Sequence, residues 1–403
     1  METINMTEAQ KALFNLVGHS LFSMPLDISS EVDWAEVLKE GIAQSVPLLA
    51  FKNIGELPIG AATSEMIRRY LKKCSETNYR CYKGHEYLHA LMTKSGIRYS
   101  IIKGVASAYY YPDPAARSMG DVDFYVAPED LERAKAVFEA DGFEVKETDS
   151  EHHVCLKKGS MDMEMHFAPI AIPGDKMRPI FLEYWSDLCD KASLTKDVFS
   201  EYMLPSDFHH GFIMITHFQL HLMPNGVGLR HLCDFVVFAN RFSDEDFRRV
   251  FEQRLKRVGL WRLAQIMSLA AVRYLGMPYK AWMGDDYATA DALMLDIARG
   301  GNFGQREKSR SFEGVFIADY KATDLGKSRF TRVFRTMNKY VKDKWSAVRW
   351  CPLLYPVGWV YFSVRFLFKR ITGRRKVSVV KSYKESGKRL KLYKSLDLYK
   401  PEK

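Results

Sequence analysis

The sequence lacks the cysteine pairs that mark zinc ribbons and thioredoxin-like redox motifs. Its six cysteines are isolated, and none belongs to a Cys-x-x-Cys pair. A secretory leader is also not expected, because Glu2 stands where a positively charged region would lie. Scattered single cysteines are typical of proteins in a reducing compartment. We therefore expect a cytoplasmic protein whose cysteines mostly fill apolar packing positions.

Internal repeats and low-complexity tracts are absent, and charged residues (27%) are outnumbered by apolar ones (47%). A chain of 403 residues with this composition can bury two or three cores, and wholesale disorder is excluded. The net charge of +10 is unevenly distributed. Residues 327–403 carry 22 Lys and Arg against four acidic residues, or +18, which leaves −8 for the first 326 residues. Such a basic end points to an anionic partner, either membrane lipid or nucleic acid.

Hydrophobic spacing divides the chain into four parts. Residues 1–98 and 176–345 have apolar residues three and four positions apart, which predicts helices. Residues 99–175 combine short apolar or alternating runs with helical runs and glycine or proline turns, which predicts a small α/β unit. Residues 346–403 hold an apolar segment and a lysine-rich end. The predicted fold class is α+β, a small mixed-sheet core with N-terminal and C-terminal helical segments.

The α/β unit is expected to contain five short strands and two helices. The helices are predicted over residues 105–111 and 128–142. The predicted strands are Tyr99–Lys103, Asp121–Val126, Phe143–Val145, His153–Lys157 and Met161–Phe167.

Two aspartates open the second predicted strand. Alternate side chains of a strand project from one face, so Asp121 and Asp123 should point together while Val122 and Phe124 enter the core. Neighbouring carboxylates repel each other unless a cation lies between them, and hard oxygen ligands suit Mg²⁺ or Mn²⁺. The alternative is a solvated strand edge with this sequence by chance, and the motif alone leaves both interpretations open.

A third carboxylate is expected on a neighbouring strand. The alternation in residues 161–167 places Asp162, Glu164 and His166 on one face and methionines on the other. The alternation leaves open which acid would bind a metal. His166 would position a substrate, form a hydrogen bond with Glu164, or be structural.

The first predicted strand leads through Gly104 directly into a helix. Glycine lets the backbone approach a ligand closely, and the free N–H groups at a helix start favour an anion. Lys103, Gly104 and Ser107 are therefore candidate contacts to phosphate, although an ordinary turn is equally compatible with this sequence. Arg117, four residues before Asp121, would either neutralise phosphate or brace the loop.

These motifs occur together in an order that resembles one family. The series is Ile102-Lys103-Gly104, Tyr110–Pro114, Arg117, Gly120–Asp123, Gly142-Phe143 and Glu164–His166, with His221, Leu229-Arg230 and Asp234 further on. Residues 80–240 thus resemble the uncharacterised bacterial nucleotidyltransferases of the DNA polymerase beta-like superfamily. The sequence departs from that pattern at Lys103-Gly104-Val105, where Gly-Ser or Gly-Gly is usual, and in the 15 residues between Val105 and Asp121.

The resemblance implies a two-metal site on a nucleotidyltransferase core. Asp121, Asp123 and Glu164 would hold Mg²⁺ or Mn²⁺ beside a nucleoside triphosphate, contacted by the phosphate-binding candidates named above. The implied reaction moves a nucleoside monophosphate to an unidentified acceptor and releases pyrophosphate. Three alternatives remain: a catalytically silent nucleotide-binding or regulatory protein on the same fold, a transferase acting on nucleic acid, and an interaction protein that docks through its basic end.

An apolar segment, Trp350–Phe368, precedes the basic end. It has the length of a spanning helix, but Pro352 and Pro356 interrupt its first turns. Arg365 within hydrocarbon would cost roughly 2–3 kcal/mol or more. Its aromatic residues and the basic cluster after it suit the surface of an anionic membrane. We therefore expect peripheral docking at the inner membrane face rather than nucleic-acid binding; a core helix with a solvated basic end is the alternative.

Overall fold

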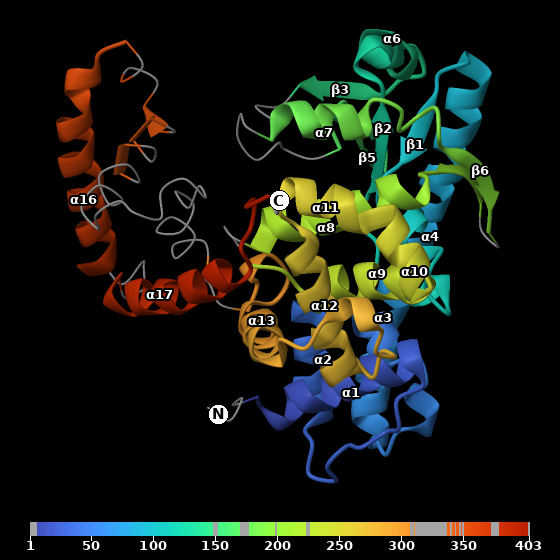
Figure 1. Ribbon diagram of the computed structural model, residues 1–403, viewed down its shortest axis with the longest axis vertical. Coiled ribbons are helices and arrows are strands. Elements are labelled where there is room, and N and C mark those ends of the chain that lie inside the picture. Colours follow the sequence, from blue (N-terminus) through green and yellow to red (C-terminus); the bar gives the residue numbers. More distant parts are fainter. Residues whose placement is uncertain are drawn as a thin grey trace.

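A computed structural model of the chain describes residues 6–147, 152–169, 177–197, 200–222, 226–306, 350–371 and 379–401, with residues 310, 337–338, 341–342, 344–345 and 348. For residues 366–371 and 379–385 it describes the backbone alone. The β-sheet lies at one end of the molecule, the first helices lie at the opposite end, and later helices fill the space between (Figure 1). The expected α+β class is therefore confirmed.

The described part of residues 1–98 is helical. Its elements are α1 (Glu8–Phe22), α2 (Trp34–Ala43), α3 (Pro47–Ala50), the 3₁₀ turn η1 (Ile54–Glu56) and α4 (Ala61–Ser95). Thr7 begins α1 with a capping box, in which its hydroxyl accepts the backbone N–H of Gln10 and the Gln10 side chain accepts that of Thr7. The 35-residue α4 connects the first helices with the sheet.

The sheet has five strands in the order β1-β2-β5-β4-β3. Their bounds are Tyr99–Ile101 (β1), Val122–Val126 (β2), Glu144–Glu147 (β3), His153–Lys158 (β4) and Met161–His166 (β5). Strands β2 and β5 run parallel, and every other neighbouring pair is antiparallel. The sheet is therefore mixed, with the two carboxylate-bearing strands side by side at its centre.

Each face of the sheet packs against a different core. Val122 and Phe124 enter the sheet core, which lies under α4 and α6 (Leu131–Ala140) and includes Phe138, Met163 and Met165. This confirms the predicted alternation of both strands. Tyr125, on the opposite face of β2, belongs to a second, helical core. The polar face of β2 and β5 consequently looks toward the helices of the body.

The helices after the sheet form most of that helical core. They are α7 (Arg178–Trp185), α8 (Asp207–Leu222), α9 (Leu229–Asn240), α10 (Asp244–Phe247), η4 (Arg248–Glu252), α11 (Gln253–Val258), α12 (Trp261–Leu275), η5 (Ala281–Met283), α13 (Tyr287–Gly300) and η6 (Asn302–Gly304). Helical patterns are predicted over residues 176–345, and the structure departs from them at one place. A hairpin of β6 (Ser193–Lys196) and β7 (Glu201–Leu204) packs β7 against α4 and β1, because Tyr202 and Leu204 complete the sheet core.

Two predicted helices of the α/β unit are shorter than expected. The helix after Gly104 is α5 (Val105–Ala108), which ends before three tyrosines because Pro112 disfavours helical backbone at the residue before it. The next helix starts with the 3₁₀ turn η3 (Pro128–Asp130) and continues as α6 (Leu131–Ala140). A four-residue α5 has a small dipole, so its start attracts a phosphate group less strongly than the start of a longer helix would.

The basic end of the chain divides into two helices with different surroundings. Helix α17 (Val379–Ser395) packs on α13, and its Tyr393 hydroxyl donates to the Leu222 carbonyl at 2.6 Å. Helix α16 (Tyr355–Ile371), which follows the turn η8 (Pro352–Leu354), stands apart from the body (Figure 1). Pro356 lies in its first turn, where a helix tolerates proline. Among the described residues, no helix is long and apolar enough to cross a membrane.

Candidate active site

Asp123 and Glu164 are direct neighbours on the parallel strands β2 and β5. Their Cα atoms are register partners, so both side chains project from the face that looks toward the helical body. Asp121 lies immediately before β2. Asp162 lies elsewhere: it is exposed and pairs with Lys157 at 3.3 Å. The strand register therefore selects Glu164 over Asp162 as the acid beside Asp123.

Asp123 is the centre of a buried polar cluster and is only 3% exposed. Lys103 Nζ donates to its Oδ1 at 2.7 Å. His166 Nε2 lies 3.0 Å from the same oxygen and 3.4 Å from Glu164 Oε2. One ligating atom each of Asp123, Glu164 and His166 lie within 4.8 Å of one another. The three side chains are thus close enough to share one cation.

The pKa values show where negative charge is unfavourable. Burial would raise the pKa of Asp123, but Lys103 and His166 outweigh it and hold that pKa well below its usual range. The Asp123 carboxylate raises the pKa of Asp121 to about 6. The hydrogen bond with His166 lowers the pKa of Glu164. The mutual repulsion of the acids is therefore concentrated at Asp121.

These side chains fit a divalent cation. Three carboxylates supply the hard oxygen ligands that Mg²⁺ and Mn²⁺ prefer. The raised pKa of Asp121 reflects excess negative charge that a cation bound there would relieve. Asp121, Asp123 and Glu164 are accordingly the residues that would hold the metal.

Two histidines that the sequence did not single out lie beside this cluster. His152 and His153 are half-buried at the start of β4, with ring centroids 5.7 and 5.2 Å from that of His166. Burial, and then His166, lowers the pKa of His152 to about 4, and burial also lowers that of His153. Both shifts favour the neutral form of these imidazoles.

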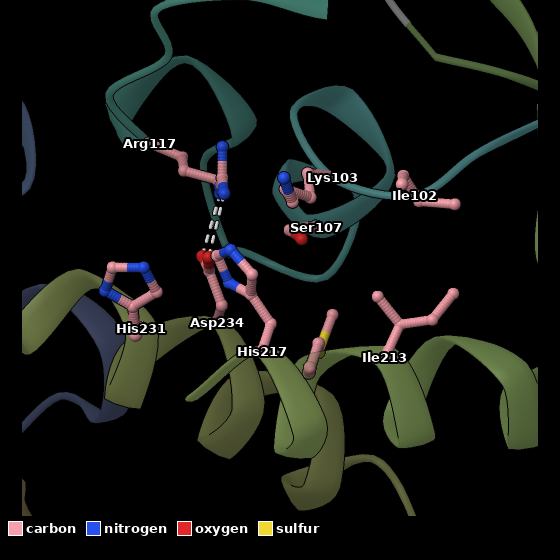
Figure 2. A pocket seen from close by; sticks show the side chains of 9 residues that line it. Ile102, Lys103, Ser107, Arg117, Ile213, His217, His231 and Asp234 are labelled. Atoms are coloured by element: carbon pink, nitrogen blue, oxygen red, sulfur yellow. Dashed lines mark hydrogen bonds and ion pairs between the residues drawn. The ribbon is translucent and has the colours of Figure 1, made fainter. Parts of the chain in front are cut away.

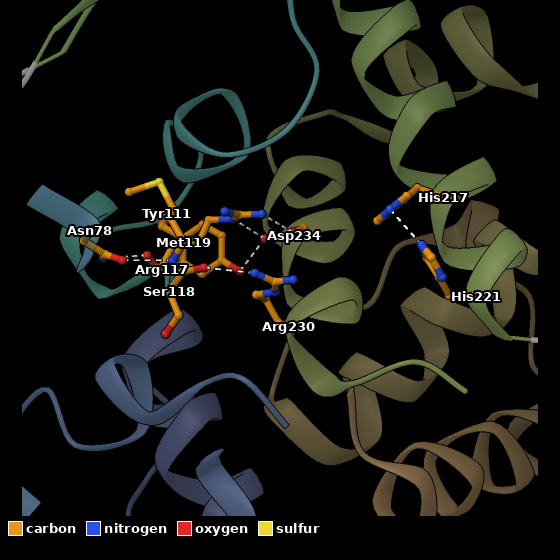
Figure 3. A network of polar contacts seen from close by, with 9 residues as sticks. All are labelled: Asn78, Tyr111, Arg117, Ser118, Met119, His217, His221, Arg230 and Asp234. Atoms are coloured by element: carbon orange, nitrogen blue, oxygen red, sulfur yellow. Dashed lines mark hydrogen bonds and ion pairs between the residues drawn. The ribbon is translucent and has the colours of Figure 1, made fainter. Parts of the chain in front are cut away.

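The loop before Asp121 is held in place from two sides (Figure 3). The Arg117 guanidinium donates twice to Asp234 of α9, through Nε and Nη2 at 2.8 Å each, and the Tyr111 hydroxyl donates to the same carboxylate at 2.7 Å. From α4, the Asn78 amide donates to the Arg117 carbonyl at 2.8 Å and accepts the Met119 N–H at 2.9 Å. Arg117 therefore has the bracing arrangement, one of the two roles considered for it.

A small pocket lies between this loop and the helical body (Figure 2). Lys103, Ser107 and Arg117 line one side, and His217 of α8 and His231 of α9 line the other. The structure thus brings together three of the four candidate nucleotide contacts beside the carboxylates. The histidines on the opposite wall were not anticipated, because no motif links α8 to this strand.

Gly104, the fourth candidate, has a structural reason to be glycine. Its φ is +59° with ψ −121°, a backbone conformation that side chains with a Cβ rarely adopt. An added Cβ would lie 2.9 Å from Nε2 of the fully buried His85. The glycine therefore lets the end of β1 pack tightly against α4.

Removal of the charge on Asp234 is expected to destabilise the protein. Asp234→Asn would leave the guanidinium of Arg117 buried without its counter-charge, which costs about 3–5 kcal/mol. Urea unfolding would measure this free energy. Glu65→Gln is the matched control, because the Arg69–Glu65 pair at 3.0 Å is exposed and should contribute about 0–1 kcal/mol. Equal stability of the two variants would contradict the bracing role.

Neutralisation of Asp121 is expected to stabilise the protein in a pH-dependent way. Its folded-state pKa of about 6 exceeds the usual 3.8. The free energy of unfolding therefore falls as the pH rises from about 3.8 to about 6, and it stays lower above pH 6. The melting temperature of Asp121→Asn should match wild type near pH 4 and exceed it above pH 6, with a chelator present. Because Asp121 is exposed, solvent screening keeps this change in melting temperature small. Asp162→Asn should show no such trend, and a pH-independent difference for Asp121→Asn would exclude the repulsion.

Comparison with known proteins identifies a family for this chain. A family model described as "Uncharacterised nucleotidyltransferase" matches residues 30–276, more than half of the chain. The match includes the sheet, the carboxylates and helices α8 and α9, and it extends beyond residues 80–240 at both ends. No curated protein and no solved structure matches the chain significantly. The chain therefore belongs to the family of uncharacterised nucleotidyltransferases.

Proposed function

We propose that the protein is a metal-dependent enzyme that transfers a nucleoside monophosphate from a nucleoside triphosphate to an acceptor and releases pyrophosphate. The observation that carries the proposal is the register of β2 and β5, which places Asp123 beside Glu164. Lys103, which donates to Asp123, also lines the neighbouring pocket together with Ser107. An aspartate pair with one later acid on an adjacent strand also supports a place in the DNA polymerase beta-like superfamily.

Each side chain has a separate task in this proposal. A divalent cation at Asp121, Asp123 and Glu164 would supply charge stabilisation for the triphosphate and activation of the acceptor oxygen. Lys103, which donates to Asp123, has its ammonium group beside the same pocket and would bind a phosphate oxygen there. Ser107 would donate a hydrogen bond to the nucleotide. Arg117, already paired with Asp234, would keep the loop and therefore Asp121 in position.

The alternative is a nucleotide-binding or regulatory protein on the same fold that does not catalyse transfer. The presence of three carboxylates that repel one another favours the enzyme, because a binding protein would gain nothing from this repulsion. Nucleotide binding without pyrophosphate release would identify the alternative.

Asp123→Asn is expected to abolish transfer while the fold persists. The amide is nearly isosteric and still accepts from Lys103, but it removes the charge that would hold the metal. With several kcal/mol of transition-state stabilisation lost, kcat/KM should fall by about 100-fold to 1000-fold or more. The assay would supply each labelled nucleoside triphosphate, Mg²⁺ and a cell extract, and mass spectrometry would identify the labelled acceptor.

Asp162→Asn is the matched control for this experiment. Asp162 lies on the same strand as Glu164, two residues away, but it is exposed and paired with Lys157. We expect Asp162→Asn to retain transfer and Glu164→Gln to lose it. Near-normal turnover of Asp123→Asn in Mg²⁺ would refute the proposed metal-dependent mechanism.

We further propose that α16 docks on the surface of an anionic membrane. An apolar stripe runs along one side of the helix and its preceding turn, since Leu353, Val357, Val360 and Val364 recur at intervals of three and four residues. Their exposed fractions are 85%, 55%, 66% and 59%. The nearby Trp350 is 91% exposed, which suits the headgroup region. A contiguous exposed apolar stripe marks an interaction surface.

The charge around α16 complements anionic lipid. Residues 344–384 contain ten Lys and Arg and no Asp or Glu. Basic residues near an anionic surface contribute about 1 kcal/mol each, and the anionic leaflet of a cell membrane faces the cytoplasm. Of the cluster that motivated the prediction, Lys369 and Arg370 lie outside the described side chains, and residues 374–376 lie outside the described residues. Docking would place the active site at the inner membrane face.

Flotation with phosphatidylserine vesicles at low salt tests this surface. Deletion of the whole basic end would also remove Tyr393 and other core residues, so substitutions within α16 are the cleaner experiment. Val357→Asp with Val360→Asp should weaken vesicle binding at least about tenfold, because two apolar side chains no longer enter the interface. Leu194→Asp, at an apolar residue of β6 that is 60% exposed, is the matched control. Absence of binding by the wild type, or equal binding by the double variant, would exclude the docking.

A further inference from the structure

Three imidazoles converge where β4 begins and β5 ends, next to the carboxylates. His153 and His166 are register partners across the antiparallel pair, and His152 directly precedes β4. One ring nitrogen of each histidine lies within 4.8 Å of those of the other two. The neighbouring row of the same sheet face holds Cys155, Glu164 and Asp123. Imidazole nitrogens therefore continue the series of possible metal ligands beyond the acids.

The hydrogen bonds of His166 determine which of its nitrogens carries the proton. Nε2 lies 3.0 Å from Asp123 Oδ1 and 3.4 Å from Glu164 Oε2, and both oxygens are acceptors when ionised. Nε2 must therefore be the donor, and in a neutral ring Nδ1 is left with a free lone pair. His166 is 1% exposed, and its Nδ1 has no hydrogen-bond partner within the part of the chain that the structure describes. A buried acceptor without a partner is costly unless it binds something.

We propose that His152, His153 and Nδ1 of His166 bind a divalent transition-metal ion of the Zn²⁺ class, at a second metal site beside the carboxylates. Imidazole prefers Zn²⁺ and related ions, whereas carboxylates prefer Mg²⁺ and Mn²⁺, so the two sets of ligands select different metals. Three protein ligands leave a fourth position for water or for an oxygen of a substrate, the usual arrangement in zinc sites that act in chemistry.

His166 links this site to the proposed active site. A metal-binding histidine generally donates its other ring N–H to a carboxylate, which fixes the tautomer and the orientation of the ring. Here the acceptors are Asp123 and Glu164, which are themselves proposed metal ligands. The ion would thereby hold His166, and through it both carboxylates, in one orientation. The inference is additional to nucleotidyl transfer and can be tested without any nucleotide.

Co²⁺ is a suitable probe, because it replaces Zn²⁺ and its visible spectrum reports coordination number. Purified full-length protein without a polyhistidine tag should bind one Co²⁺ with the intense absorption of a four- or five-coordinate site, and Zn²⁺ should displace it. Since loss of an outer-shell partner alone costs about 10–100-fold in metal affinity, His152→Gln and His153→Gln should each weaken binding by at least about 100-fold. Asp123→Asn should weaken it less, since it removes only a partner of His166.

Two controls separate this site from other ways of binding Co²⁺. His19→Gln alters a histidine of α1, far from the sheet, whose Nδ1 forms a hydrogen bond with the Met24 carbonyl. This variant should leave the Co²⁺ affinity unchanged. Cys155→Ser tests the competing group of His153, Cys155 and Glu164, whose ligating atoms also lie within 4.8 Å of one another. Retention of binding by Cys155→Ser supports the three-histidine site, whereas its loss, with a sulfur-to-cobalt band in the wild type, would overturn it.

The outcome does not depend on whether the protein is a transferase. Zn²⁺ should raise the melting temperature of the wild type but not of His153→Gln, which also shows whether that variant is folded. A six-coordinate spectrum, or equal Co²⁺ affinity of the wild type and both histidine variants, would overturn the inference. Mg²⁺-dependent transfer by a protein that does not bind Co²⁺ would leave the proposed function intact. Co²⁺ binding by a protein without transfer activity would support the three-histidine site and contradict the proposed function.

Discussion

The parallel pairing of β2 and β5 is the constraint on which the site depends. Because side chains alternate between the faces of a strand, a shift of one residue would turn Glu164 toward the sheet core and bring a methionine next to Asp123. Burial prevents that shift: Met163 and Met165 are at most 1% exposed, and they pack with Val122 and Phe124 on the inner face. The hydrophobic pattern of one face thus fixes the polar geometry of the other. The neighbouring antiparallel pairing of β4 and β5 aligns His166 with His153, so the second proposed metal site depends on that pairing.

The sheet alone does not complete the site, since its polar face is closed by the helical body. The buried pair of Arg117 and Asp234 joins the loop before Asp121 to α9, while Asn78 holds that loop to α4. Residues more than a hundred positions apart in sequence therefore meet around one short loop. The pocket beside the carboxylates lies within this junction and is lined from both sides. A family match that spans residues 30–276 is consistent with such a site, because neither the strands nor the helices could form it separately.

Local alternation was enough to predict the carboxylate face, because every second residue of β2 and β5 is apolar and the period of a strand is two. Side chains that act across long sequence distances could not be predicted this way. Asn78 lies in a long amphipathic helix where nothing distinguishes it from a solvated position, and its partners are about forty residues away. His152 and His153 have no recognisable ligand spacing in the sequence, because the third histidine of the group, His166, lies on another strand. The β6–β7 hairpin was missed because four-residue strands are too short for a period to be resolved.

The two halves of the basic end show why charge alone does not predict location. Helix α17 is strongly basic, yet its Tyr393 and the adjoining Leu396 and Leu398 are buried in the helical core, and Arg389 donates to the Leu222 carbonyl at 3.0 Å. Its apolar residues have partners in the body, so its charges lie on a docked helix. Helix α16 is the more apolar of the two, yet residues such as Val360 are exposed. Among the residues that the structure describes, it contacts a short preceding segment on one side, where Trp345 packs against Tyr361. Burial of the remaining stripe would require a surface that the described residues do not supply, and the surrounding positive charge favours a surface that is anionic.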